Sequence, residues 1–292
     1  MSERAEALQQ RAVDLAFAVA WALVRRLPES VVTWVFRRIA DFAVRRDGRG
    51  VRRLRSNLAV VRPNATAAEL DALTREGMRS YLRYWQEAFR LPEWSDERIV
   101  GRVRTVNEKL LRDAHDGGRG VICALPHLAN YDHAGAWAGR TGMPVSTVAE
   151  RLRPESLFDR FVAYRKKLGM EVLPLTGSDE HVFGVLADRL RAGGFVCLVA
   201  DRDLSENGVP VRFFGRQSRM PAGPAALSLR TGAPLIPATL HYEGPDLVIT
   251  FHETIESAGG AAVMTQRCAD AFAAGIAAHP QDWHMLQRIF LD

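Results

Sequence analysis

A histidine and an aspartate stand five residues apart in the segment PHLANYDHAG, which covers residues 126–135. The segment follows the apolar run VICAL at 121–125, which is typical of a buried strand. His127 has the chemistry of a general base, and a carboxylate such as Asp132 fixes the tautomer of an imidazole and stabilises its protonated form. On one continuous helix the two side chains would point about 140° apart, so they meet only if the chain turns between them. The pair therefore indicates either a site at a strand-to-helix turn or a structural histidine.

Motifs for other chemistries are absent from the sequence. It has no GxSxG nucleophile elbow, no GxxxxGK[ST] or GxGxxG phosphate loop and no HExxH zinc motif. His127, Asp132 and His133 offer too few ligands at close spacing for a metal site, so we expect no metal. Without a serine or cysteine elbow, the nucleophile that His127 activates is expected to be a substrate hydroxyl. Three widely spaced cysteines are predicted to be reduced, buried thiols: Cys123, Cys197 and Cys268.

Short apolar runs alternate with helical patterns from about residue 105 onward. This alternation predicts an α/β fold with a central, mostly parallel sheet of about seven strands and helices on both faces. The predicted strands are 120–125, 144–149, 171–175, 195–200, 209–214, 234–240 and 246–251. The predicted helices are 106–116, 130–140, 155–168, 179–192, 221–231 and 261–278. An earlier helix is expected from a Thr66 cap, with Glu69 at capping-box spacing, to about Leu91.

Polar residues follow three of these predicted strands. Ligands of parallel, doubly covered sheets bind beyond the carboxyl ends of the strands. We therefore expect these side chains at one edge of the sheet, although the strand order is not readable from the sequence. They are His127, Glu150, Asp201 and Arg202.

The positive charge of the chain is concentrated near its N-terminus. Residues 1–62 contain 13 arginines and 6 acids, a net charge of +7, whereas the remaining residues contain 26 basic and 28 acidic residues, a net charge of −2. No RNA- or DNA-binding motif accompanies these arginines, so a nucleic-acid partner is not expected. We divide the chain into an N-terminal basic amphipathic helical region, residues 1–62, and one α/β core, residues 63–292.

Apolar stretches lie between the arginine pairs of this basic region. Leu15 to Val24 contains ten apolar residues, which is too short to cross a bilayer as a helix, and Glu3 and Glu6 argue against a signal peptide. The stretch 31–42 contains Trp34 beside arginines. Apolar, aromatic helices edged by arginine favour attachment to an anionic membrane surface. The alternative is that the helices pack on the core and the arginines are solvated.

Four segments together resemble the glycerolipid acyltransferase superfamily, and in particular its bacterial lipid A acyltransferase branch. The His-x4-Asp spacing of HLANYD resembles the superfamily signature. The segments span most of the chain in the expected order. They are RRLRSNLAVVRP at 52–63, HLANYDHAGAW at 127–137, VAERLRPESLFDRFVAYRKKLGMEVLPL at 148–175 and DRDLSENGVPVRFFGRQSRMPAGPAALSLRTGAPLIP at 201–237.

Within that branch, DRDL and FFGRQSRMPAGPA resemble the actinobacterial acyltransferases of phosphatidylinositol mannosides. The resemblance implies transfer of a fatty acyl group, typically palmitoyl, from acyl-CoA to the 6-hydroxyl of a mannose on phosphatidylinositol mannoside. It also implies a peripheral protein at the cytoplasmic face of the cell inner membrane, with no cofactor besides the acyl-CoA co-substrate. Alternatives are another glycolipid or lipid A-type acceptor, an acyl carrier protein as donor, or a non-catalytic lipid-binding protein on this scaffold.

The resemblance also assigns roles to individual residues. His127 and Asp132 are implied as the catalytic pair, and Glu150 and Asp201 as acids that face the sugar and the catalytic histidine. The acid at the latter position is often glutamate in the family, so Asp201 is one methylene shorter. Arginines expected to hold a lipid phosphate or the acyl carrier, through their bidentate guanidinium groups, are Arg165, Arg202, Arg216 and Arg219.

Overall fold

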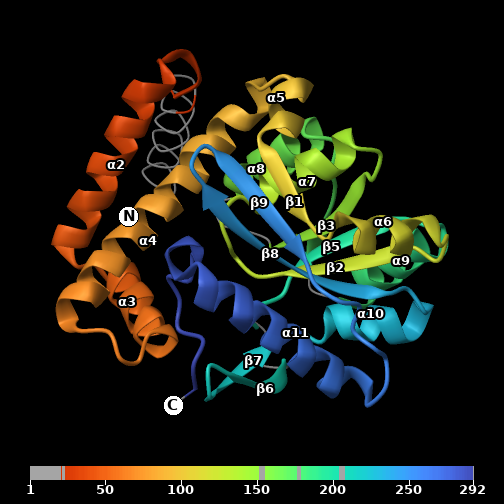
Figure 1. The fold of residues 1–292 in the computed structure, drawn as a ribbon. Helices are drawn as coiled ribbons and strands as arrows, with labels where there is room; N and C mark the ends of the chain where they lie inside the picture. The colour runs from red at the N-terminus through yellow and green to blue at the C-terminus, as the bar shows by residue number, and fades with distance from the viewer. Residues whose placement is uncertain (1–20, 22–23, 151–154, 176–178, 204–207, 292) are drawn as a thin grey trace, which may run out of the picture.

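A seven-stranded sheet forms the centre of the computed structural model, which describes residue 21 and residues 24–150, 155–175, 179–203 and 208–291 (Figure 1). The strand order is β1-β9-β8-β2-β5-β3-β4, and neighbouring strands are parallel except for the antiparallel pair β8 and β9. The predicted mostly parallel α/β sheet is therefore confirmed. Its strands are β1 (Val103–Val106), β2 (Val121–Leu125), β3 (Val145–Glu150), β4 (Glu171–Leu175), β5 (Phe195–Val199), β8 (Leu235–Glu243) and β9 (Asp246–Phe251).

The prediction for the segment 209–214 is wrong in one respect, because this strand lies outside the main sheet. It is β6 (Val209–Phe213), which pairs with β7 (Arg216–Met220) in a separate antiparallel hairpin. Its buried positions alternate, so only one of its faces packs on the protein. The seventh strand of the sheet is β1, which lies at the edge beside β9. It has no buried residue, so its sequence lacks the apolar run that made the other strands predictable.

Helices cover both faces of the sheet (Figure 1). The helices α6 and α7 pack on one face, where α8 joins them, whereas α9, α10 and α11 pack on the other. The predicted helices are all present, with small shifts at their ends. Their bounds are α6 (Glu108–Asp116), α7 (Tyr131–Arg140), α8 (Glu155–Lys167), α9 (Asp179–Arg191), α10 (Gly223–Thr231) and α11 (Gly260–Ala278).

A helical layer precedes the sheet and packs around one long helix, α4 (Ala67–Arg90). It contains α2 (Glu29–Arg46) and α3 (Arg49–Val61), which both contact α4, and the short α5 (Asp96–Gly101) follows. The predicted capping box is present, since Thr66 and Glu69 exchange hydrogen bonds at the start of α4. A small separate core joins these helices through Ala40, Val51, Leu54, Leu58 and Met78.

The membrane-related predictions stay predictions. Most of the stretch from Leu15 to Val24 lies outside the described residues. Among the helices that the structure describes, none is both long enough and apolar enough to cross a membrane. The division between residues 62 and 63 stays a prediction.

The register between β2 and β5 brings two polar residues to one edge of the sheet. Leu125 pairs with Val199 at the carboxyl ends of these adjacent parallel strands. His127 and Asp201 each lie two residues beyond that pair, so the sheet itself carries them to the same place.

We expect Gly120, just before β2, to be essential for the position of that strand. It has a φ of +68°, and a Cβ atom there would lie 2.4 Å from the carbonyl oxygen of Leu190. Gly120→Ala should lower the free energy of unfolding by about 3 kcal/mol, because backbone atoms must move and the left-handed conformation is unfavourable for alanine. Gly118→Ala is the matched control. Its φ is +73° with open space around the added methyl, so only the conformational cost of about 1 kcal/mol should appear in urea unfolding. Equal losses in both variants would contradict this reading.

Candidate active site

A tight turn joins the end of β2 to the start of α7. Within it, Ala129 has a φ of +44°, a left-handed conformation that residues other than glycine rarely adopt. Asn130 is the N-cap of α7, and its side-chain oxygen accepts a hydrogen bond of 2.9 Å from the backbone N–H of His133. The turn thus ends the strand, begins the helix within five residues and puts Asp132 in the first turn of α7.

A segment near the C-terminus holds the backbone of this turn. The N–H of Ala129 donates to the carbonyl oxygen of Asp282, and the N–H of His284 donates to that of His127, each at 2.9 Å. Leu128 and Trp283 form an antiparallel bridge between the same two segments. These bonds satisfy buried backbone groups that the turn leaves without helix or sheet partners, and they offset the unfavourable conformation of Ala129.

The carboxylate that contacts the histidine belongs to Asp201. Its Oδ1 lies 2.5 Å from Nδ1 of His127, while its Oδ2 accepts hydrogen bonds from the backbone N–H of His127 and from the indole N–H of Trp283, both at 3.0 Å. Asp201 is fully buried. Burial alone would raise the pKa of its carboxyl, but the charge of His127 and these three hydrogen bonds lower the pKa below its usual value.

The predicted pairing of His127 with Asp132 is therefore replaced by pairing with Asp201. Both oxygens of Asp132 are engaged elsewhere, with Nε of Arg165 at 2.8 Å and the hydroxyl of Tyr84 at 2.9 Å. The physical reason is the chain turn between β2 and α7, which places Asp132 in the first helical turn of α7, where it faces α4 and α8. Asp201, which the resemblance implied as an acid facing the histidine, does contact His127, whereas the catalytic roles of both residues stay predictions.

Asp132 and Arg165 form a buried ion pair beside the histidine. Burial alone would lower the pKa of the Arg165 guanidinium, but the negative charge of Asp132 outweighs it and raises the pKa above its ordinary value. The pKa of the Tyr84 hydroxyl is also raised well above its usual value, by burial and by the same carboxylate. Arg165 is thus charged and bound to Asp132 through Nε, and its expected contact with a lipid phosphate or the acyl carrier stays a prediction.

The other predicted residues are distributed more widely. Arg202 directly follows Asp201 and is half-buried. Glu150 is the last residue of β3, next to β5, but its side chain lies outside the described part of the structure. Arg216 and Arg219 are exposed on β7, in the separate hairpin.

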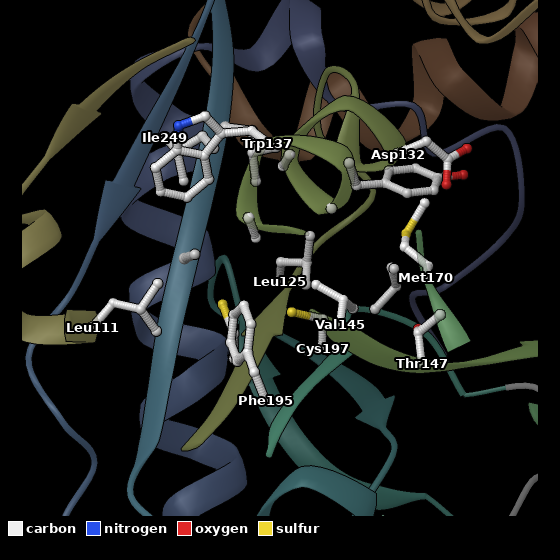
Figure 2. Close-up of a pocket in the computed structure, with 18 of the residues that line it drawn as sticks. Leu111, Leu125, Asp132, Trp137, Val145, Thr147, Met170, Phe195, Cys197 and Ile249 are labelled. Carbon is white, nitrogen blue, oxygen red and sulfur yellow. The ribbon is translucent and has the colours of Figure 1, made fainter. Parts of the chain in front are cut away.

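A narrow apolar cavity with a volume of about 70 Å³ lies between α7 and the sheet (Figure 2). Tyr131, Asp132 and Arg165 line it at one end, and the ring of Tyr131 meets the ring of His127 edge-on, with centroids 5.9 Å apart. Figure 2 shows Asp132 and Met170 toward one side of the cavity and Leu111 and Ile249 toward the other. Its wall is otherwise built from apolar side chains of the sheet and α7, including the sulfur atoms of Cys123 and Cys197.

A second buried polar cluster lies next to the turn. The hydroxyl of Ser80 donates to Asp282 at 2.6 Å, so it accepts the hydrogen bond of 2.9 Å from Nε2 of His284. Burial, followed by the charge of His127, lowers the pKa of His284 to about 3. This histidine is therefore neutral, with its proton on Nε2.

Sequence reasoning missed the residues that support the pair from elsewhere in the chain. Trp283, Tyr84 and Ser80 lie on a C-terminal segment and on α4, and nothing in their spacing relates them to His127. The WH dipeptide at 283–284 is the one usable signal, because both side chain types need polar partners when buried. Among the described residues, no three His, Cys, Asp or Glu side chains are grouped to hold a metal ion.

The chain is similar to known acyltransferases over almost its whole length. The model of the bacterial lipid A biosynthesis acyltransferase family matches residues 3–292. A phosphatidylinositol mannoside acyltransferase of Mycolicibacterium smegmatis is 46% identical over 275 residues, which are 94% of this chain and 90% of that protein. A protein of the same name from Mycobacterium tuberculosis is 44% identical over 279 residues, which are 94% of this chain and 88% of that protein.

The buried neutral histidines predict a loss of stability in mild acid. His284 has a pKa of about 3 in the folded chain, and the pKa of His241 is lowered to about 4 by burial and by its stacked neighbour His279. The unfolded chain binds these protons near pH 6.5, so the free energy of unfolding falls as the pH drops below that value. For His284 alone the expected loss between pH 7 and pH 4 is about 3 kcal/mol.

His284→Gln should flatten this dependence when urea unfolding is followed from pH 7 to pH 4. His181→Gln, at an exposed position of α9, is the control and should leave the slope unchanged. The raised pKa of Asp282 lowers the free energy of unfolding as the pH rises above the ordinary pKa of an aspartate carboxyl. This effect is opposite in sign to that of the histidines, and both variants retain it. An unchanged slope in His284→Gln would disprove the assignment.

Proposed function

The chain belongs to the bacterial lipid A biosynthesis acyltransferase family and is an acyltransferase, and we propose that it transfers palmitoyl from acyl-CoA to the 6-hydroxyl of a mannose on phosphatidylinositol mannoside. The observation that carries the proposal is the pairing of His127 with buried Asp201 close to an apolar cavity, since Tyr131 both lines the cavity and contacts the ring of His127. The names of the two mycobacterial relatives support the acceptor. The same residues serve acyl transfer to any lipid hydroxyl, so the acceptor rests on those names.

His127 acts as the general base in this proposal. Its Nδ1–H donates to Asp201, which leaves the lone pair of Nε2 to take the proton of the acceptor hydroxyl. The hydroxyl oxygen attacks the thioester carbonyl, and a tetrahedral oxyanion forms. Its collapse breaks the C–S bond, and the departing thiolate of CoA takes the proton from Nε2, which gives the ester and the free thiol. Asp201 stays ionised throughout and stabilises the imidazolium.

The cavity has the apolar lining and the extent across the sheet that a long acyl chain needs, and its walls must move apart to admit the chain because its volume here is about 70 Å³. Its lining includes residues of β3, β5, β2, β8 and β9, which are adjacent in the sheet. Four intervals of about 4.8 Å make a path of roughly 19 Å across these strands. Fifteen C–C bonds of an extended palmitoyl chain, at about 1.25 Å each, span a similar length.

A direct transfer without an acyl-enzyme agrees with the state of the cavity thiols. Burial, and then the hydrogen bond with Cys123, raise the pKa of Cys197 well above its usual value. A thiol that stays protonated is a poor nucleophile. The role of Asp132 is then structural and electrostatic: it lines the cavity beside Arg165 and binds both Arg165 and Tyr84.

We further propose that the protein works as a peripheral protein at the cytoplasmic face of the inner membrane. One side of α2 exposes Val31, Trp34, Val35, Ile39 and Phe42, at intervals of about one helical turn. Arg38 lies over the ring of Trp34 and Arg46 over that of Phe42, with 5.4 and 5.1 Å to the ring centroids. Apolar side chains with arginines beside them complement an anionic lipid surface.

Arg25, an arginine of the basic N-terminal region, is bound within the helical layer. Its Nε donates to the carbonyl oxygen of Phe89 and its guanidinium lies 3.4 Å from Glu93. It therefore ties the start of the helical layer to α4, and the membrane contact is expected to depend on α2.

Asp201→Asn should lower the transfer rate by at least 10³-fold, because the amide no longer stabilises the tautomer and the imidazolium that His127 needs. His127→Ala should abolish transfer. Asp132→Asn, which leaves the His127–Asp201 contact intact, should lose less activity than Asp201→Asn. Labelled palmitoyl-CoA and phosphatidylinositol mannoside, with mass spectrometry of the product, provide the assay, and thermal melting checks the fold.

Phosphatidylinositol and a lipid A precursor test the acceptor in the same assay. Preferred acylation of either one would contradict the acceptor proposed here, and label retained on the denatured protein would contradict the direct transfer. Folded His127→Ala protein with ordinary turnover would exclude His127 as the base.

Trp34→Ser combined with Phe42→Ser should reduce sedimentation with phosphatidylinositol-containing vesicles at least tenfold, because two large exposed side chains no longer enter the lipid. Their exposed fractions, 59% and 52%, indicate a small effect on folding. Leu229→Ser with Val263→Ser, exposed apolar residues of α10 and α11, is the matched control. If both double variants sediment alike, α2 is not the lipid-binding face.

A further inference from the structure

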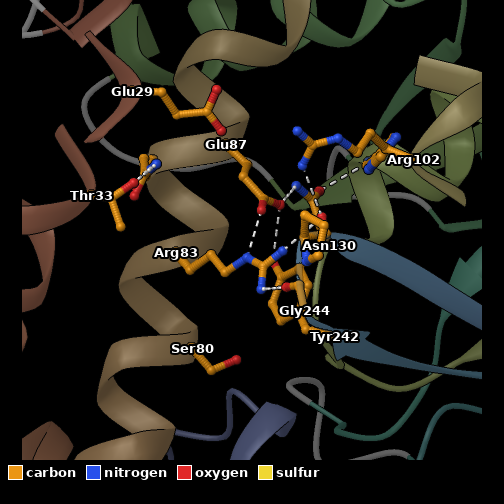
Figure 3. A network of polar contacts seen from close by, with 12 residues as sticks. Glu29, Thr33, Ser80, Arg83, Glu87, Arg102, Asn130, Tyr242 and Gly244 are labelled. Carbon is orange, nitrogen blue, oxygen red and sulfur yellow. Dashed lines mark hydrogen bonds and ion pairs between the residues drawn. The ribbon is translucent and has the colours of Figure 1, made fainter. Parts of the chain in front are cut away.

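One face of α4 contacts the turn between β2 and α7, the start of α7 and the C-terminal segment that holds the turn. Ser80, Tyr84 and Glu87 follow one another at helical spacing and are all buried. Ser80 bonds Asp282 of the C-terminal segment, Tyr84 bonds Asp132, and Glu87 bonds Asn130. Only the contact of Glu87 reaches the residue that caps α7 (Figure 3).

The carboxylate of Glu87 is shared among three donors. Its Oε1 accepts from Nε of Arg83 at 2.6 Å, while its Oε2 accepts from Nδ2 of Asn130 at 2.9 Å and from the hydroxyl of Tyr242 at 3.2 Å. Arg83 in turn lies 3.7 Å from the ring centroid of Tyr242 and donates to the carbonyl oxygen of Gly244. Arg83 and Tyr242 therefore hold the carboxylate in one orientation, independently of its bond to Asn130.

This bond decides which way the amide of Asn130 faces. Asn130 is fully buried, and its two side-chain ends are used differently: Nδ2 donates to Glu87, and Oδ1 accepts from the N–H of His133. A flipped amide would put its NH2 group against that N–H, where both are donors. The carboxylate of Glu87, which only accepts, excludes the flipped state.

We propose that Glu87 is a positioning residue for acyl transfer: by orienting the Asn130 amide, it fixes the start of α7 and with it the turn that carries His127. The inference rests on the proposed function for its kinetic consequence. Loss of the cap frees the residues that follow Ala129. Alanine does not favour the left-handed conformation that Ala129 adopts, so this residue does not hold the turn in place by itself.

Glu87→Gln distinguishes the positioning of Asn130 from a simple ion pair between Glu87 and Arg83. The amide oxygen of the introduced glutamine turns to the charged Arg83, so its NH2 group faces the NH2 group of Asn130 and drives the flip. Asn130→Asp brings two carboxylates together. In the double variant the polarity of the bond is reversed: the glutamine NH2 donates to the aspartate, the other aspartate oxygen caps His133, and Arg83 keeps its acceptor. Aspartate and asparagine are about equal as N-caps.

We expect each single variant to lower kcat at least tenfold with less than a threefold change in KM, and the double variant to return kcat to within threefold of the wild type. Glu108→Gln is the matched control. Glu108 also accepts from an arginine one turn away, Arg112, and from a hydroxyl, that of Thr105, but it does not touch the turn. Glu108→Gln should therefore leave kcat unchanged.

Hydrogen exchange of the amides at 131–135 provides a readout that does not depend on activity. Exchange should accelerate in Glu87→Gln and return to the wild-type rate in the double variant. Wild-type kcat in Glu87→Gln, or a double variant no better than the worse single one, would overturn the inference. If the wild type transfers no acyl group to any acceptor, the proposed function fails, and unaltered exchange in Glu87→Gln would then reject the positioning role independently.

Discussion

The buried carboxylate of Asp201 is the group on which the candidate site depends. It receives three hydrogen bonds, two from His127 and one from Trp283, and it has no contact with solvent. An ionised carboxylate in such surroundings is stable only if its partners remain in place. Because the backbone N–H and the ring of the same histidine both bind it, Asp201 fixes the main chain and the side chain of His127 together.

Support for that pair comes from parts of the chain that lie far from it in sequence. The C-terminal segment supplies Trp283 to the carboxylate and two backbone hydrogen bonds to the turn. The helix α4 supplies Ser80, Tyr84 and Glu87 from one face. A turn with a left-handed alanine has little preference for its own conformation, so it needs this external support, and the site can form only once the whole core is folded.

The sheet and the position of His127 were predictable from local signals, whereas the pairing was not. Short apolar runs identified β2, β5 and their neighbours, and a polar residue at a strand end indicated the edge where ligands bind. The partner of His127 was assigned to Asp132 because it is near in sequence. Asp201 becomes the partner only through the register of β2 with β5, which strand order decides and a single sequence does not reveal. The contacts of Trp283 and Glu87 also join residues far apart in the sequence, so a single sequence does not reveal them. The strand β1 was missed because it has no apolar run.

The helix α7 meets two opposite physical requirements at once. Its side, with Ala134, Gly135, Trp137 and Ala138, lines the apolar cavity, where any unpaired polar group would be costly. Its N-terminus carries Asp132 and the Asn130 cap, and both are buried and fully engaged in hydrogen bonds. Because one rigid helix joins the cavity wall to the polar turn, a shift at the cap also moves the wall. In the proposed reaction, the distance between an acyl carbonyl in the cavity and Nε2 of His127 therefore depends on contacts at the cap. A site of this kind tolerates changes along the cavity wall more readily than changes among the few polar residues that fix the start of α7.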